Sequence, residues 1–98
     1  MASIRLIKKD IDYLVGEVVS DSYLALYFHP AKQDEIVKVM QEAVELRNKL
    51  FDQANNPPEK NNPSLVKKHY RHIGQELFAG IDDLFEKLSK ASQTETKK

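Results

Sequence analysis

Proline, the residue that most strongly interrupts a helix, is confined to two places in this chain. The first is Pro30, and the second is the segment "NNPPEKNNP", residues 55–63, which contains the other three prolines. These two breaks leave three long segments, roughly residues 4–28, 31–54 and 63–90. The question for the fold is therefore what each uninterrupted segment forms.

Apolar residues recur at helical spacing in all three segments, so that each segment carries one apolar stripe. The first stripe consists of Ile4, Ile7, Ile11, Leu14, Val15, Val18, Ser22, Ala25 and Leu26. The second consists of Ile36, Val37, Met40, Ala43, Val44, Leu50, Phe51 and Ala54. The third consists of Val66, Tyr70, Ile73, Leu77, Ile81, Leu84, Phe85 and Leu88. The β-branched residues of the first segment would also suit a strand, but strict alternation fails and so long a strand would be unusual.

Residues typical of helix ends support the three predicted helices. Asp34 and Glu35 lie near the start of the second helix, where carboxylates suit the positive end of the helix dipole. Asn62 followed by Pro63 predicts an N-cap and a first helical residue. Gly74 lies on the flank of the third stripe, where the absence of a side chain would permit another helix to approach closely.

Three helices of similar length, joined by a short connection and a loop, predict an all-α fold: an up-down-up bundle of three long helices. Residues 1–90 form its single domain. Residues 91–98 form a flexible polar tail, because they include no large apolar residue. Dimerisation is one way in which such a bundle is completed.

The charge balance and the absence of cysteine exclude several classes of function. The 98 residues include 15 basic and 15 acidic side chains, whereas nucleic-acid-binding modules carry a clustered positive excess. The same balance removes the polybasic signal for anionic membranes. Without cysteine there are no disulfides, thiolate metal ligands or cysteine nucleophiles. We therefore expect neither a nucleic acid nor a membrane as a partner.

The same sequence features predict a cytoplasmic protein. No apolar run approaches the ~18 residues of a membrane span. The first residues, "MASIRLIKKDID", lack the uninterrupted apolar stretch of a signal peptide. A cysteine-free chain also fits a reducing compartment.

Four segments of the chain carry a resemblance to a known family. They are "DIDYLVGEVVSDSYLALYFHP", "EAVELRNKL", "NPSLVKKHY" and "ELFAGIDDLFEKLS". Together they resemble a small, uncharacterised family of all-helical bacterial proteins of unknown function, over most of residues 4–90. The resemblance implies an all-helical fold and a bacterial cytoplasmic setting, and it brings no activity, cofactor or catalytic residue.

The stretch "KKHYRHIGQE", residues 67–76, places His69, His72 and Glu76 on neighbouring positions of a helix surface. A metal site in a helical bundle draws ligands from facing helices, with Glu-x-x-His motifs that point inward. The order here is His-x-x-His-x-x-x-Glu, and neither other predicted helix offers a matching motif. We predict that the three residues lie on a boundary or exposed flank without a metal. Metal binding and acid–base catalysis are the alternatives.

Arg47 falls at the centre of the apolar stripe of the second helix. An unpaired buried guanidinium is costly, so either the stem extends to the surface or the head meets a carboxylate. In an up-down-up bundle Arg47 is level with residues near 13 and 71. Asp10, Glu17 and Glu76 are therefore the expected partners in a structural ion pair.

A functional interpretation of the same residues is the alternative. Arg47, His69, His72 and Glu76 would then form a polar cluster that binds an anionic ligand, beside Tyr13, or a metal. His29, between the first helix and Pro30, likewise has two interpretations. It terminates the helix, where an imidazolium suits the negative end of the dipole, or it is a pH-sensitive or ligand-binding residue.

The segment "YLALYF", residues 23–28, makes the end of the first helix apolar or aromatic nearly all round. A helix in a three-helix bundle buries only part of its circumference. Tyr23, Leu24, Tyr27 and Phe28 are therefore either covered by the rest of the chain or form a contact with another chain. Interfaces favour tyrosine and phenylalanine, which supports the second possibility.

The sequence contains no Gly-rich phosphate loop and no nucleophile elbow. We predict no catalytic, cofactor-binding or metal-binding residue and no cofactor. The expected function is that of a non-catalytic helical interaction module, which self-associates or binds a protein partner through Tyr23, Leu24, Tyr27 and Phe28. The alternative is a helical bundle that binds a small ligand or a metal with the polar cluster around Arg47 and His72. This alternative includes an enzyme that uses the same cluster.

Overall fold

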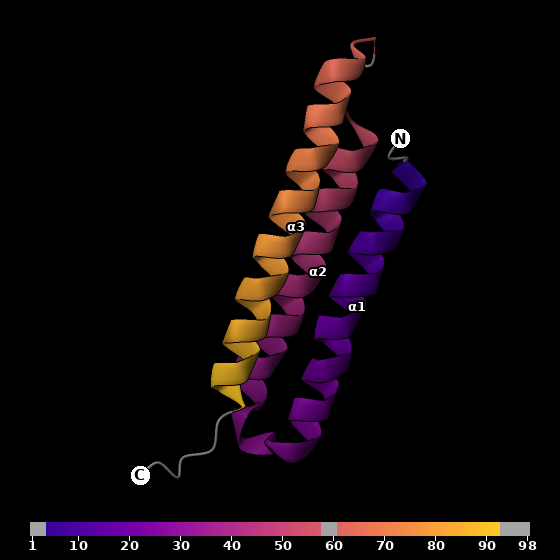
Figure 1. Ribbon diagram of the computed structural model, residues 1–98. Coiled ribbons are helices and arrows are strands. Elements are labelled where there is room, and N and C mark those ends of the chain that lie inside the picture. The colour runs from indigo at the N-terminus through magenta and orange to yellow at the C-terminus, as the bar shows by residue number, and fades with distance from the viewer. Residues whose placement is uncertain (1–3, 58–60, 93–98) are drawn as a thin grey trace.

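The computed structural model describes residues 4–57 and 61–92. The elements are α1 (Ile4–Phe28), the short 3-10 helix η1 (Pro30–Lys32), α2 (Gln33–Asn55) and α3 (Pro63–Ala91). Figure 1 shows α1 and α3 running in the same direction and α2 running opposite to them. No strand occurs among the described residues, so the predicted three-helix bundle is confirmed. The predicted tail lies largely outside the described residues, except that Ala91 is the last residue of α3 and is buried.

Both connections lie where the prolines predict them. The backbone N–H of His29 donates to the carbonyl of Ala25 at 2.7 Å and closes the last turn of α1, immediately before Pro30. At the other end of the bundle, the side-chain oxygen of Asn62 accepts a hydrogen bond from the backbone N–H of Leu65 at 3.3 Å. The predicted N-cap of α3 is therefore confirmed, and the proline that follows it is the first helical residue.

The core consists of residues from all three apolar stripes. Its buried apolar members are Ile11, Val15, Val18, Ala25, Ile36, Val39, Ala43, Leu50, Ala54, Ile73, Leu77, Ile81, Leu84, Leu88 and Ala91. Ser22 is also fully buried, and its hydroxyl donates to the carbonyl of Val18 at 2.7 Å. This polar group is therefore satisfied within its own helix and costs the core little. Within the described ranges, no helix combines the length and apolar character needed to cross a bilayer.

Of these two glycines, Gly80 and not Gly74 lies in close contact with another helix. A Cβ atom on Gly80 would lie 2.7 Å from Cδ2 of Leu46, so α2 and α3 pack tightly at this level. A Cβ atom on Gly74 would have no contact within 4 Å among the described residues. The expectation for Gly74 is wrong because its flank of α3 borders a hollow beside α1, whereas Gly80 faces α2.

Candidate functional site

Arg47 meets a carboxylate of α1, but not one of the expected residues. Its Nε lies 2.7 Å from Oδ1 of Asp12, and its guanidinium carbon lies 4.2 Å from the centre of the Phe51 ring. The side chains of Arg47 and Asp12 are 38% and 54% exposed. The pair is therefore a partly exposed contact between α1 and α2, not a buried one.

The expected partners Asp10 and Glu17 lie on a different flank of α1. Around the helix, Asp12 is about 160° away from Asp10 and about 140° away from Glu17, at 100° per residue. Asp10 borders a hollow shared with α3, so its flank faces α3 and the flank of Asp12 faces α2. The level along the bundle was predicted correctly, near residue 13, and only the flank was wrong.

His69 closes the C-terminal end of α2. The last four carbonyls of a helix have no partner within it. One of them, the carbonyl of Gln53, lies 2.6 Å from Nε2 of His69, and the next, that of Ala54, accepts from the hydroxyl of Tyr70 at 3.4 Å. Because a carbonyl only accepts, Nε2 of His69 is the nitrogen that carries the hydrogen. His69 thus has a structural partner at the α2–α3 contact.

His72 and Glu76 lie one turn further along α3. Nε2 of the exposed His72 is 3.8 Å from Oε2 of Glu76, and the same oxygen is 3.5 Å from Nζ of Lys49 on α2. Both residues therefore belong to the α2–α3 side, whereas Arg47 belongs to the α1–α2 side. The structure does not assemble the four residues into one site.

Tyr13, the fifth member of the proposed ligand cleft, lies on the third side of the bundle, between α1 and α3. Within residues 4–57 and 61–92 no group of three or more histidine, aspartate or glutamate side chains is placed to hold a metal ion. Arg47, His69 and Glu76 each make a separate polar contact with another helix, whereas the contact of His72 is with Glu76 of its own helix.

The four residues of the YLALYF segment are exposed. Tyr23, Leu24, Tyr27 and Phe28 are between 59% and 79% accessible to solvent. The rings of Tyr27 and Phe28 meet edge to face, with centroids 5.1 Å apart. The other helices of the chain therefore leave the end of α1 uncovered.

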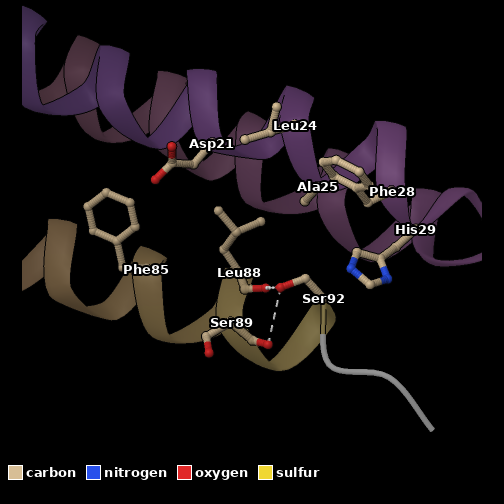
Figure 2. A pocket seen from close by; sticks show the side chains of 9 residues that line it. All are labelled: Asp21, Leu24, Ala25, Phe28, His29, Phe85, Leu88, Ser89 and Ser92. Carbon is tan, nitrogen blue, oxygen red and sulfur yellow. Dashed lines mark hydrogen bonds between the residues drawn. The ribbon is translucent and has the colours of Figure 1, made fainter.

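Two of these residues border the larger of two hollows between α1 and α3. This hollow measures about 500 Å³, and Leu24 and Phe28 lie on its α1 side. Figure 2 shows them opposite Phe85 and Leu88 of α3, with Asp21 at one end of the hollow and His29 at the other. His29 therefore follows the last residue of α1 and borders a hollow, and its interpretation as a pH-sensitive or ligand-binding residue stays a prediction.

The second hollow lies nearer the start of both helices and measures about 290 Å³. Tyr13 and Phe78 are its most exposed apolar members, at 67% and 64%, and Asp10 borders it on α1. Both hollows lie between helices that run in the same direction, so they follow one another along a single side of the bundle (Figure 1).

We call this side the α1–α3 face and define it by nine residues. Seven of them border the hollows. The other two are Glu17, four residues from both Tyr13 and Asp21, and Asp82, four residues from Phe78 and three from Phe85. Spacings of three and four bring side chains to the same side of a helix. The nine are Asp10, Tyr13, Glu17, Asp21, Leu24, Phe28, Phe78, Asp82 and Phe85.

Sequence reasoning found only the Leu24 and Phe28 end of this face. Tyr13 and Phe78 had been visible as large apolar residues that belong to no stripe, which was the available signal. Tyr23 and Tyr27 do not border either hollow. Exposed apolar side chains therefore occur on this side of the bundle beyond the predicted segment, at Tyr13 and Phe78.

Comparison with protein-family models, with curated proteins and with solved structures gives no match for this chain. The α1–α3 face is therefore the feature from which a function is inferred.

Proposed function

We propose that this protein is a non-catalytic helical interaction module and that the α1–α3 face is its binding surface. The observation that carries the proposal is the alignment of Tyr13, Leu24, Phe28 and Phe78, all exposed, along one side of the bundle. Large apolar side chains that gather on one side of a small protein are typical of interaction sites.

The distribution of exposed apolar residues supports this choice of surface. Among the described residues of α2, Val44 is the one large apolar side chain that is exposed, and α1 carries most of the others. A bundle of three helices leaves room for another helix in the groove between two of them, where it would bury its own apolar stripe. The occupant belongs to a second copy of the chain or to another protein.

Photo-crosslinking in the native host tests the proposal. Phe28 or Phe78 is replaced by photoreactive benzoylphenylalanine, and Gln41, exposed on α2, is replaced in the same way as a matched control. We expect adducts of discrete mass from positions 28 and 78 and none from position 41. An adduct of twice the mass of the chain indicates self-association, and other masses indicate another protein. No adduct from either face position, or equal adducts from all three positions, would overturn the proposal.

A further inference from the structure

We propose that the occupant of the α1–α3 face is a basic amphipathic helix of another protein, which carries apolar residues in the groove and lysine or arginine residues along its edges. This inference rests on the proposed function and adds the chemistry of the partner. It follows from the charges that surround the two hollows and from the spacing of the apolar side chains.

The charges on this part of the bundle have one sign. From Asp10 to Phe28 on α1, and from His72 to Glu86 on α3, the sequence contains no lysine or arginine. The same two stretches contain four carboxylates each, which are Asp10, Asp12, Glu17, Asp21, Glu76, Asp82, Asp83 and Glu86. Although the whole chain has equal numbers of basic and acidic residues, the charged side chains of these two stretches are all acidic, apart from His72.

Half of these carboxylates are neutralised within the bundle. The paired residues and their partners are Asp12 with Arg47, Glu76 with Lys49, Asp83 with Lys87, and Glu86 with Lys90. The other four have no lysine, arginine or histidine partner within residues 4–57 and 61–92, and they are Asp10, Glu17, Asp21 and Asp82. All four belong to the α1–α3 face, so the unneutralised charge of α1 and α3 surrounds the groove.

The apolar residues of the face define the length of the partner. Tyr13 and Leu24 are eleven residues apart on α1, which is about 16 Å, and Phe78 and Phe85 are seven apart on α3, which is about 10 Å. A helix in the groove reaches both hollows with side chains two to three turns apart. It therefore needs roughly 15–20 residues, with apolar positions spaced by three and four.

A second copy of the chain fits this face less well. It would bring the same four carboxylates and, from residues 10–28 and 72–86, no lysine or arginine to meet them. Opposed like charges are unfavourable across an interface, whereas lysine or arginine beside an apolar stripe complements both properties of the groove. We therefore assign the face to a different protein.

Two synthetic helical peptides of 22 residues provide the test. Both carry leucine at spacings of three and four, with lysine at all flanking positions in one and glutamate in the other. Binding to the full chain is measured by fluorescence anisotropy at 150 mM NaCl. We expect the lysine peptide to bind at least about tenfold more tightly than the glutamate peptide.

A pair of matched protein variants distinguishes the effect of the carboxylates on the α1–α3 face from the effect of the net charge of the protein. Glu17→Gln/Asp21→Asn/Asp82→Asn removes three charges from the face, and Asp34→Asn/Glu35→Gln/Glu45→Gln removes three exposed charges from α2. Circular dichroism first establishes that both are helical. We expect the first variant to bind the lysine peptide about tenfold more weakly, as the sum of three exposed ion pairs, and the second to bind less than about threefold more weakly.

Several results would overturn the inference. These are no binding of the lysine peptide, equal affinity for both peptides, equal losses in both variants, and a dimer of the wild-type chain in sedimentation that Phe78→Ser abolishes. Crosslinking distinguishes this failure from failure of the proposed function. If adducts form at positions 28 and 78 and persist unchanged in the Glu17→Gln/Asp21→Asn/Asp82→Asn variant, the interaction surface stands and the basic partner is wrong.

Discussion

The guanidinium of Arg47 joins α2 to α1 through a 2.7 Å contact with the carboxylate of Asp12, and it lies over the ring of Phe51. Both charged side chains are partly exposed, so solvent screens the pair. The contact therefore positions two helices without the large desolvation cost of a buried ion pair.

Replacing Arg47 by methionine keeps most of the stem that packs on Phe51 and removes the charge. We expect Arg47→Met to stay folded and to change the free energy of unfolding by about 1 kcal/mol or less, since exposed pairs contribute roughly 0–1 kcal/mol. Urea unfolding followed by circular dichroism measures this value. A double-mutant cycle with Asp12→Asn should give a coupling energy below about 1 kcal/mol, and a coupling of several kcal/mol would contradict the screened pair.

His69 and His72 offer a matched comparison on one helix. His69→Ala leaves the carbonyl of Gln53 without its side-chain donor, whereas His72→Ala removes an exposed ring. Because both changes alter helix propensity equally, the difference between them reports the side-chain contacts, of which the hydrogen bond of His69 to Gln53 is the shortest. We expect His69→Ala to be less stable than His72→Ala by about 1 kcal/mol, measured by denaturant unfolding. Equal stabilities would show that the contact with Gln53 contributes nothing.

Glycine substitutions test how closely α2 and α3 pack. Gly16 has open space around it, so Gly16→Ala should raise the free energy of unfolding by about 1 kcal/mol through helix propensity. At Gly80 the same gain is opposed by overpacking against Leu46, which costs roughly 1–3 kcal/mol. We therefore expect Gly80→Ala to be less stable than Gly16→Ala by at least about 1 kcal/mol in urea unfolding. A smaller difference would mean that Leu46 moves aside freely.

Lys87 of α3 contacts Glu42 of α2, and its pKa is raised. Hydrogen bonds to Glu42, first, and to Asp83 raise the pKa of Lys87 above its ordinary value of 10.5. A raised pKa in the folded state stabilises the protein below the unfolded-state pKa, and this stabilisation is lost as the pH rises through the folded-state value. It is therefore constant near neutral pH.

A nitrogen-15 titration of the Lys87 amine measures the folded-state pKa. We expect Glu42→Gln to lower this pKa more than Asp83→Asn does, because the hydrogen bond to Glu42 is the larger cause. The reverse order would indicate that the i, i+4 contact within α3 dominates over the contact between helices.

The sequence by itself determined the helices and their ends. Apolar residues at helical spacing specify a stripe on each segment, and Pro30 and Asn62 mark the breaks through local backbone chemistry. The spacing along the chain also predicted that Arg47 lies level with residues near 13, since an up-down-up order and a rise of about 1.5 Å per residue fix levels without any knowledge of packing.

Only the tertiary structure decided which flank of each helix faces which neighbour. A stripe specifies an inward direction, but the two arrangements of three helices around it differ in hand and bury the same residues. This is why Asp12 rather than Asp10 meets Arg47, and why Gly80 rather than Gly74 is close to α2. The α1–α3 face arises for the same reason: Tyr13 and Phe78 come together because α1 and α3 are neighbours on that side, which periodicity does not encode.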